Sequence, residues 1–414
     1  MHPNELKQTL RRARYFCGID VAKDNHVACI LDKDAVPLLR SQSFANTAAG
    51  FACLREQLTK AGGARRVAIA MEATGHYWYS LHDFLVSCGY GVAVLNPIQT
   101  AMQAKKGIRK TQTDRIDAGH IATLLKNGDY KPALVPGDLA LTCRQLTRLR
   151  HVMVRQESRI RQWLWSRLHP VWPEYEPLFA SPFCKTGRRL LEAACTPAEV
   201  LAIPLEDLTT LIRKTSRGKF AATKAAEVRQ AAESSIGITR GLEAARTSIR
   251  LLLAQLEALE PIRKQQEGQI RALAEQLPRY ILTLPGANPI SAVSLFGETD
   301  PIDGFAGPSQ LVAFAGLDLV VDQSGNYQAP HRHISKRGSP FLRRTLWHMA
   351  HQACLKEGDL RDYFLRKKAA GLKHLPAVTA VAIKLCHVTW RILTDRRDYL
   401  PQPPTSASQY NPKP

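Results

Sequence analysis

The sequence is short of acidic residues. Its 414 residues contain 36 Asp and Glu against 57 Lys and Arg, which gives a formal net charge of +21. This imbalance predicts a polyanionic partner. We expect nucleic acid and not a membrane surface, because the basic residues occur in several segments and not in one amphipathic helix. The alternative is an ordinary basic globular protein with no such partner, since 45% apolar and 22% charged residues are typical values.

Paired cysteines, an apolar leader and long apolar runs are also missing. The nine cysteines are scattered, with no C-x-x-C pair and no metal-ligand spacing, so we predict neither a disulfide nor a zinc site. The first residues, MHPNELKQTLRRAR, lack the apolar segment of a signal peptide. No stretch approaches the roughly 18 apolar residues of a membrane span. We therefore expect a cytoplasmic protein with no membrane partner.

Strand signals stop after about residue 140. Three short runs between Tyr15 and Phe44 are separated by the turn-rich links AKDN and DKDA, which predicts an antiparallel meander. A buried strand ending at Glu72 and another in residues 90–97 alternate with helical stretches, which predicts parallel additions to the sheet. This order occurs in ribonuclease H-like folds and in actin-like kinases. The turn after Asp20, VAKDN, is not glycine-rich, which disfavours a kinase.

An arginine-rich helix is predicted next. Residues 144–167 carry seven arginines against one acid, Glu157. At about 100° per residue, four of the arginines share one narrow stripe: Arg144, Arg148, Arg155 and Arg159. Most charge runs are solvated faces, but so few acids nearby favour contact with a nucleic-acid backbone.

Two further segments are predicted to be helical. From Leu242 to Leu277 an apolar heptad repeat indicates a coiled coil or a long helical hairpin, which Pro261 should kink or divide. Residues 277–298 place a Pro-Gly turn between two helix-compatible runs, a weak sign of a helix-hairpin-helix DNA-binding element. The Pro- and Ser-rich residues 401–414 predict a disordered tail.

Four acids are placed so that their carboxylates should converge. Asp20 lies in the first strand, and Glu72 ends the strand expected to be its parallel neighbour. Asp114 and Asp117 are three residues apart and share a helix face. Carboxylates this close raise one another's pKa, so such a cluster requires divalent cations, and Mg²⁺ suits all-oxygen ligands. Two ions about 4 Å apart can stabilise the attacking and leaving oxygens of a phosphoryl displacement. Singly, each acid has a plainer reading as a cap or a strand end.

A basic run stands directly before the helical pair of acids. It contains residues that we expect to hold the polyanion on which the metal acts: Lys105, Lys106, Arg109, Lys110 and Arg115.

Seven short motifs follow one another along nearly the whole chain. They are GIDVAK, MEATG, TDRIDA, LPGANPISA, LVAFAGL, SGNYQAPHRHISKRG and FLRRTLWHMA. This ordered set resembles the DEDD transposases of the insertion-sequence 110 type. The chain departs from that pattern in two places: KTQTDR has two extra residues where KTDR is expected, and the middle region is longer than usual.

The resemblance implies an α/β architecture with three domains. These are a ribonuclease H-like (RuvC-like) catalytic domain in residues 1–140, a helical coiled-coil connector in 141–279 and a small, mostly helical transposase domain in 280–400. Asp20, Glu72, Asp114 and Asp117 map to the acidic tetrad of the family. The implied protein is a prokaryotic recombinase that acts on donor and target DNA, guided by a structured bridge RNA, and forms a homo-oligomer, a dimer or a tetramer.

The resemblance also implies a serine that becomes covalently joined to DNA, which maps to Ser324. Without the resemblance, Ser-Gly in a polar loop is more often a turn. Ser335 is the competing nucleophile. A basic cluster that we expect to bind phosphate follows Ser324 in the sequence: Arg332, Lys336, Arg337, Arg343 and Arg344.

The sequence thus predicts an RNA-guided DNA transposase with a magnesium-binding tetrad and a serine nucleophile. Two alternatives stay open. One is a RuvC-like junction nuclease that hydrolyses DNA with two metal ions and forms no covalent intermediate. The other is a nucleic-acid-binding protein without catalysis, which would leave the convergent acids unexplained.

Overall fold

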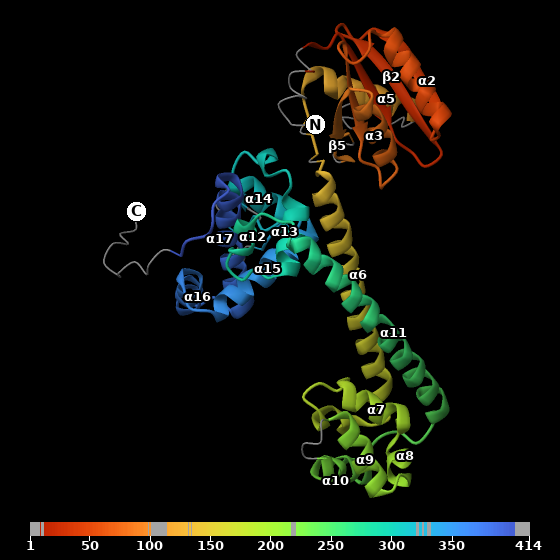
Figure 1. Cartoon of the computed structure of the whole chain (residues 1–414), viewed down its shortest axis with the longest axis vertical. Helices are drawn as coiled ribbons and strands as arrows, with labels where there is room; N and C mark the ends of the chain where they lie inside the picture. Colours follow the sequence, from red (N-terminus) through yellow and green to blue (C-terminus); the bar gives the residue numbers. More distant parts are fainter. Residues whose placement is uncertain are drawn as a thin grey trace, which may run out of the picture. The chain divides into compact units, whose positions relative to one another are not determined.

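The chain forms two compact units, Met1–Gly137 and Asp138–Pro414, in the computed structural model of Figure 1. The structure describes residues 9, 12–97, 99–100, 114–130, 132–133, 135–216, 221–319, 323–324, 327–328 and 333–401. The side chains of residues 114, 115, 323, 324, 327 and 328 are outside that description. The domain boundaries expected after residues 140, 279 and 400 stay predictions.

Five strands form the sheet of the first unit. They are β1 (Tyr15–Asp20), β2 (Asn25–Asp32), β3 (Pro37–Ala45), β4 (Val67–Glu72) and β5 (Gly91–Leu95). Their order is β3-β2-β1-β4-β5, with β1 to β3 antiparallel and with β4 and β5 added in parallel. This confirms the meander followed by parallel additions that the turn spacing predicts.

Helices cover both faces of this sheet. On one face, α2 (Ala48–Lys60) and α3 (Trp78–Ser87) bury leucines against inward-facing residues of β1 and β4 such as Ile19 and Ile69. On the other face, α5 (Asp114–Asn127) packs through Ile121, Leu124 and Leu125. The central strands are therefore buried on both sides, which explains why β4 and β5 are almost continuously apolar.

The second unit is helical apart from two short strands, as far as it is described. Its elements are α6 (Asp138–Leu168), the 3₁₀ helix η1 (Pro173–Leu178), α7 (Lys185–Ala193), α8 (Pro197–Ala202), α9 (Leu205–Thr215), α10 (Ala221–Glu233), α11 (Leu242–Ala274), α12 (Arg279–Leu282), α13 (Pro289–Thr299), η2 (Ile302–Gly304), α14 (Pro308–Ala315), β6 (Gln323–Ser324), β7 (Tyr327–Gln328), α15 (Pro340–Leu355), α16 (Asp359–Ala369) and α17 (His374–Asp395).

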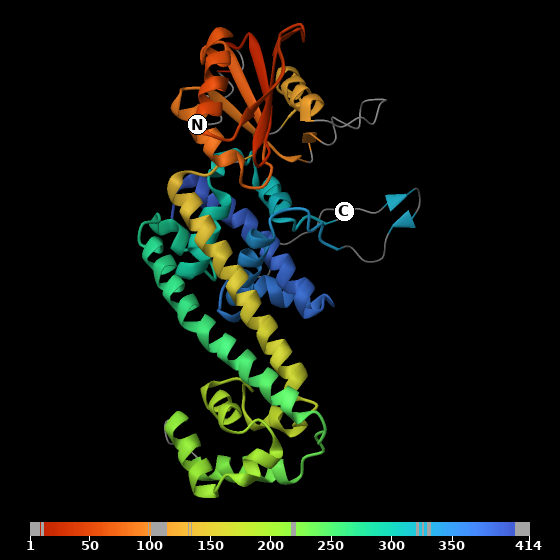
Figure 2. The same cartoon turned by 90° about the vertical axis from the view of Figure 1, so that its right-hand side faces the viewer.

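The two longest helices, α6 and α11, pack along each other (Figure 2). They run antiparallel, because residues early in α6 meet residues late in α11: Arg150 bonds Glu267, and Arg161 bonds Glu260. The sequence predicts that Pro261 kinks or divides this segment; division is wrong, since α11 is one helix of 33 residues, and the kink stays a prediction. Proline removes one backbone hydrogen bond, whereas ion pairs to α6 hold α11 on both sides of Pro261.

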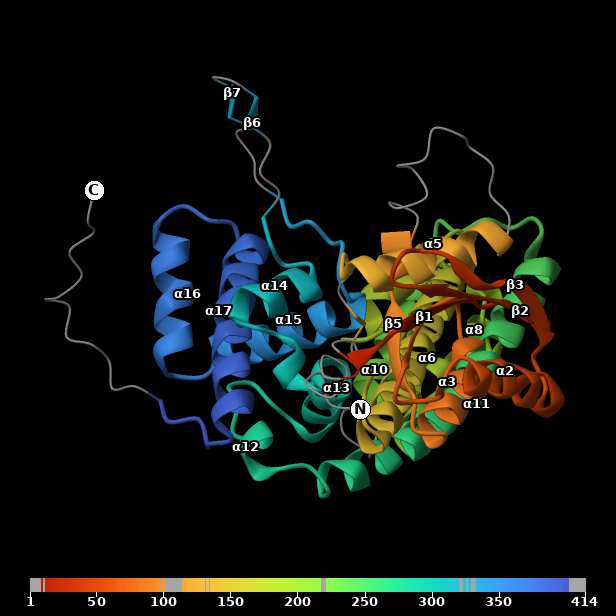
Figure 3. The same cartoon turned by 90° about the horizontal axis from the view of Figure 1, so that it is seen from above.

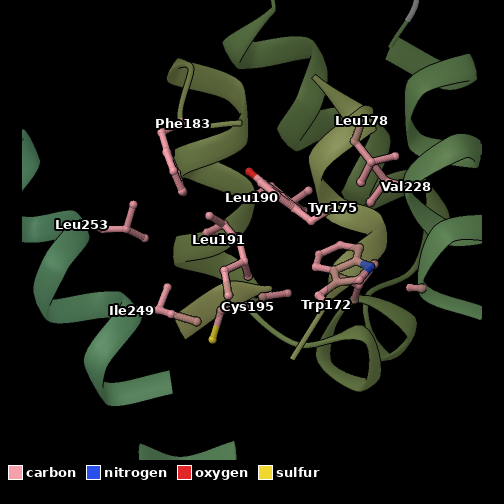
Figure 4. Close-up of a cluster of buried hydrophobic side chains, with 14 of the residues drawn as sticks. Trp172, Tyr175, Leu178, Phe183, Leu190, Leu191, Cys195, Val228, Ile249 and Leu253 are labelled. Atoms are coloured by element: carbon pink, nitrogen blue, oxygen red, sulfur yellow. The ribbon is translucent and has the colours of Figure 1, made fainter. Parts of the chain in front are cut away.

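At the far end of this pair, α7 to α10 and η1 enclose an apolar core around Trp172 and Tyr175 (Figure 4). Leu190 and Leu191 of α7 and Val228 of α10 fill this core together with Ile249 and Leu253 of α11. The core requires Gly187, because a Cβ there would stand 2.3 Å from the carbonyl oxygen of Pro182. The tip is thus a small helical body built onto α6 and α11.

The remaining helices gather around α17 and α15 (Figure 3). Helix α17 corrects one expectation from the sequence. Its 22 residues reach a mean hydropathy of 1.2 over the most apolar window, so by length and composition it could cross a membrane. Half of that window is buried, and α17 packs against α14, α15 and α16 as a core helix does.

The helix-hairpin-helix prediction stays open, and the first of its two helices, α12, has four residues. Strands β6 and β7 lie where the sequence predicts no strand.

Candidate active site

Asp20 and Glu72 end neighbouring parallel strands. The β1/β4 register joins Ile19 to Met71, and each strand ends one residue later, at Asp20 and Glu72. Alternate residues of a strand point to one face of the sheet. Ala70 packs against α5, so Glu72, two residues on, points to the α5 face. The two acids therefore stand side by side at the same sheet edge, on strands roughly 5 Å apart.

Gly18 fixes how closely α5 approaches β1. A Cβ at Gly18 would lie 2.2 Å from the carbonyl oxygen of Ala118 and 2.3 Å from the amide nitrogen of Ala122, both in the α5 backbone. Gly18 therefore faces α5, and so does Asp20, two residues further along β1. Asp117 immediately precedes Ala118 at this close contact.

The direction of α5 brings its first turn to the acidic edge. Lys126, near the end of α5, donates a hydrogen bond to the carbonyl oxygen of Lys33. Lys33 follows β2, whose Asp32 pairs with Tyr15 at the beginning of β1. The last turn of α5 thus lies near the beginning of β1. Its first turn, from Asp114 to Asp117, lies toward the end of β1, where Asp20 stands.

Glu72 and Asp117 are oriented without being neutralised. Thr100 and Thr74 donate hydroxyl hydrogen bonds to the two carboxylate oxygens of Glu72, at 2.6 and 3.3 Å. The nearest partner of Asp117 is His120, whose Nδ1 is 3.9 Å from Asp117 Oδ1 and is a buried atom without a hydrogen bond. Within the described residues neither carboxylate forms an ion pair with Lys or Arg. Carboxylates kept together without cationic partners suit a divalent cation.

The described residues do not enclose a metal ion by themselves. No three His, Cys, Asp or Glu side chains among them gather closely enough to enclose a metal ion. The side chain of Asp114, the fourth predicted ligand, lies outside the described residues. The same holds for several predicted nucleic-acid contacts: Lys105, Lys106, Arg109, Lys110, Arg115 and Arg332.

The two candidate serines, Ser324 and Ser335, both precede α15 in the second unit. Ser324 is on β6, where its backbone pairs with Tyr327 of β7. Ser335 follows the bridge between Leu319 and Ile334, and its hydroxyl donates to Asp318 Oδ1 at 2.5 Å and accepts from the amide of Arg337. Its bond to Asp318 therefore joins two segments that are 17 residues apart.

The basic residues after Ser335 take different positions. Lys336 and Arg337 are exposed. Arg343 donates to the carbonyl oxygen of Ala315, and burial lowers its pKa. Arg344 lines a cavity of about 330 Å³ between α6, α13 and α15. The sequence reasoning included Arg344 but missed three other cationic or titratable residues of that cavity: Arg150, His151 and His348.

The predicted arginine stripe of α6 is split in two. Arg144 donates to the carbonyl oxygen of Gly297 at 2.6 Å. Arg148 forms two hydrogen bonds with the buried carboxylate of Glu298, at 2.7 and 2.9 Å, and lies over the ring of Phe341. These two arginines bind α13 to α6.

The other half of the stripe faces outward. Arg155 and Arg159 are exposed and line a hollow of about 440 Å³ with Trp163, whose exposed fraction is 51%. No ion pair joins either arginine to an acid in the described part of the chain. Exposed arginines beside an exposed aromatic ring are suited to a nucleic-acid backbone and its bases. This half retains the predicted character.

Comparisons with known proteins match both ends of the chain. A family model of the DEDD transposases of IS110 matches residues 17–173, and a model described as "Transposase IS116/IS110/IS902 family" matches residues 279–365. The chain is 28% identical over 408 residues to the "Insertion element IS116 uncharacterized 44.8 kDa protein" of Streptomyces clavuligerus, covering 96% of this chain and 98% of that protein.

A second relative is the "Insertion element IS900 uncharacterized 42 kDa protein" of Mycobacterium paratuberculosis. It is 26% identical over 406 residues, which cover 95% of this chain and 99% of that protein.

The class of protein follows from the fold and these matches together: an enzyme that transposes DNA. The five-stranded sheet is consistent with the ribonuclease H-like domain of DEDD enzymes, which generally use a divalent metal ion. The two matched regions together cover more than half of the residues. The chain belongs to the IS110 family of DEDD transposases.

Proposed function

We propose that this transposase cleaves and rejoins DNA at a divalent metal site formed by Asp20, Glu72, Asp114 and Asp117. The observation that carries the proposal is the placement of three of these acids. Asp20 and Glu72 end adjacent parallel strands, and α5 brings Asp117 toward the same edge. Oxygen donors of this kind fit Mg²⁺, which would supply positive charge to stabilise the negative charge of a phosphoryl group under attack.

The proposed nucleophile is Ser324. Its Oγ attacks a backbone phosphorus atom of DNA, a new Oγ–P bond forms, and one P–O bond to a sugar breaks. The displaced sugar oxygen takes up the proton that the serine loses. In the second half of the reaction a sugar hydroxyl attacks the same phosphorus, and Ser324 regains its proton. The exchange needs no outside energy source, because each step forms one phosphoester bond and breaks another.

Ser324 is preferred to Ser335 because the motif SGNYQ contains it. The hydroxyl of Ser335 donates to Asp318 Oδ1, 17 residues earlier, and accepts from the Arg337 amide, so it helps to join two segments of the chain. Ser324 lies on a two-residue strand. Lys336 and Arg337, further along the same segment, can neutralise charge on the transferred phosphate.

Guidance by a structured RNA belongs to the same proposal. The exposed half of the α6 stripe, Arg155 and Arg159, would contact the RNA backbone, with Trp163 available for stacking on a base. A homo-oligomer would allow Ser324 of one copy to serve the acids of another. Two nucleic acids per reaction also fit a chain with a formal charge of +21.

The test is to incubate the protein with guide RNA, target DNA and Mg²⁺, denature it, and locate DNA-linked peptides by mass spectrometry. We expect an adduct on Ser324, which Ser324→Ala removes. We also expect Asp117→Asn to abolish the adduct. Asp129→Asn, which changes an exposed acid after the other end of α5, should retain it.

Each other outcome points elsewhere. An adduct on Ser335 moves the nucleophile. Cleavage without any adduct favours the hydrolytic junction nuclease. RNA and DNA binding without cleavage in the wild-type protein favours a binding protein and leaves the acidic edge without a role.

A further inference from the structure

The cavity between α6, α13 and α15 carries positive charge and no negative charge. Two residues of α6, Arg150 and His151, line it opposite two residues of α15, Arg344 and His348. Of the described side chains that line the cavity, none is acidic. Its volume is about 330 Å³, and it lies wholly within the second unit. It shares no residue with the acidic edge of the sheet.

The neighbouring acid is already shared. Glu267 of α11 accepts hydrogen bonds from Arg150 at 2.8 Å and from Arg263 at 2.9 Å. One carboxylate thus faces two guanidinium groups. Arg344 has no ion pair and no hydrogen bond within the described part of the chain, although it stands near Arg150 and Arg155. The cavity consequently holds an excess of positive charge that the protein does not balance.

The titration of these groups agrees with that excess. Burial, followed by the charges of Arg150 and Arg155, lowers the pKa of Arg344. Burial lowers the pKa of His348, with further contributions from Arg344, His351 and Arg150. Burial lowers the pKa of His151 too, followed by Arg344, Arg155, Arg150 and His348. Each cation is less stable because of the others, so a bound anion would relieve all of them.

Neutral hydrogen-bonding groups complete the lining. From α13 come Ser291 and Ser294, and the hydroxyl of Ser294 bonds that of Thr345 at 2.7 Å. Helix α13 has 11 residues and begins at this cavity, where Asn288 caps it and also lines the wall. A helix N-terminus adds a favourable field for an anion. Hydroxyl and amide groups beside two arginines are what a phosphate oxygen requires.

We propose that this cavity binds a backbone phosphate of the DNA substrate, with Arg344 and Arg150 as the principal contacts and His348 as a hydrogen-bond donor. The proposal rests on the proposed function only in taking DNA as the ligand. DNA is favoured because Arg344 lies within the matched transposase region, residues 279–365, and a transposase has DNA as its substrate.

The two histidines make phosphate binding by the cavity depend on pH. The groups facing His348 and His151 are Arg150 and Arg155 from α6, Arg344 and His351 from α15, and Glu267 of α11 through Arg150. Helix α13 contributes no charged group to the lining. In the free protein, burial and the neighbouring charges favour the neutral form of both histidines. A phosphate raises their pKa, so binding takes up protons, and the affinity increases as the pH falls through 6.5 and below.

The test measures DNA binding and not catalysis. Full-length protein carrying Asp117→Asn, which removes cleavage, is titrated into a fluorescent DNA duplex at several salt concentrations. We expect Arg344→Gln to weaken binding roughly tenfold and to lower the salt-dependence slope by about one. The matched control is Arg271→Gln, an exposed arginine of α11 that does not line the cavity, and we expect it to have a smaller effect. Circular dichroism confirms that each variant folds.

The histidine arm uses the same assay between pH 8 and pH 5.5. With one proton taken up on binding, the affinity of the parent protein rises by up to roughly tenfold per pH unit. His348→Gln should flatten this dependence. Unchanged affinity, slope and pH profile in Arg344→Gln and His348→Gln would overturn the proposal. A loss confined to an RNA of the same sequence would overturn it as well and assign the cavity to the guide. Because Asp117→Asn is present throughout, a failure of the proposed catalysis leaves this result unaffected.

Discussion

The long helical pair and the sheet of the first unit treat their acids in opposite ways. Along α6 and α11, the buried or half-buried acids are matched to arginines of another turn or another helix. Arg263 bonds Glu157 at 2.5 Å, and Arg188 bonds Glu260 at 3.1 Å. At the sheet edge, Glu72 has only threonine hydroxyls as described hydrogen-bond partners.

This difference separates acids that hold helices together from the acid that we propose binds a metal ion. A chain with 57 basic residues could readily place an arginine beside every acid. An ion pair removes a carboxylate from chemistry, since its lone pairs are occupied and its charge is balanced. The acids kept away from arginine are the ones that remain able to bind a cation. In the helical pair, ion pairs fix the register of two helices. At the sheet edge, the negative charge of Glu72 stays available to a cation.

The largest effect should come from breaking a structural pair. Glu157→Ala should lower the free energy of unfolding by about 3 kcal/mol, because the guanidinium of Arg263, only 19% exposed, loses one of its two carboxylate partners and keeps only Glu267. Glu72→Ala should change the free energy of unfolding by less than about 1 kcal/mol and abolish transposition. Guanidinium denaturation and a recombination assay measure the two quantities. Equal destabilisation by both variants would end the distinction between the two kinds of acid.

The second effect concerns the close approach of α5 to the sheet. Gly18→Ala should cost about 2 kcal/mol and greatly reduce activity, because a Cβ 2.2 Å from a backbone oxygen pushes α5, and Asp117 with it, off β1. Gly119→Ala is the matched control, since a Cβ there meets nothing within 4 Å. It should stabilise α5 by up to about 1 kcal/mol. Full activity in Gly18→Ala would show that the position of α5 is not critical.

The third effect is a different pH dependence of the two regions. Burial lowers the pKa of His26, which lies under α2 in the first unit. The unfolded chain therefore binds a proton at pH 6.5 that the folded sheet does not, so stability is lost as the pH falls below 6.5. Burial raises the pKa of Glu267 in the helical pair, but the hydrogen bonds and charges of Arg150 and Arg263 outweigh burial and lower it. The contribution of Glu267 to stability therefore persists until the pH falls below 4.5.

Denaturation curves recorded from pH 8 to pH 4 would show these two windows. His26→Gln should reduce the slope of stability against pH between 6.5 and 5, whereas Glu267→Gln should reduce the slope below 4.5. A His26 variant with the wild-type slope would mean that protonation of His26 is not linked to unfolding.

The smallest effect is expected on nucleic-acid binding by the arginine stripe. Replacing Arg155 and Arg159 by Gln should lower the salt-dependence slope of RNA binding by about one for each lost contact. Arg144→Gln should leave the slope unchanged, because this arginine is bound to Gly297. Electrophoretic mobility shifts at increasing salt would measure both. Equal slopes in the wild type and both variants would mean that no arginine of the stripe contacts RNA.

The sequence predicts local features well and distant pairings poorly. Short links force antiparallel neighbours, and an apolar run ending in one acid fixes where Glu72 stands, so the sheet and its acidic edge could be predicted. The partner of Arg148 could not, because Glu298 is 150 residues away and no local pattern links the two. The single acid in residues 144–167 made this helix look unpaired for the same reason. Most of the acids that pair with its arginines belong to α11 and α13.

Two other outcomes have equally physical reasons. Pro261 breaks an isolated helix, but within α11 the ion pairs to α6 outweigh one missing hydrogen bond. The cavity around Arg344 is formed by three helices, and no local pattern in the sequence marks the residues that line it. Only their packing brings Arg150, His151 and His348 together.

The central claim is that the acidic edge of the sheet binds a divalent metal ion, and cleavage of the protein itself by bound iron tests it most directly. Fe²⁺ takes the place of Mg²⁺, and ascorbate with peroxide generates radicals that cut the nearest backbone. We predict cuts beside Asp20, beside Glu72 and within residues 114–117, all suppressed by excess Mg²⁺. Glu72→Gln and Asp117→Asn should each remove the cuts, whereas Asp129→Asn should not. Cuts at other positions, or the same cuts in both active-site variants, would contradict the account.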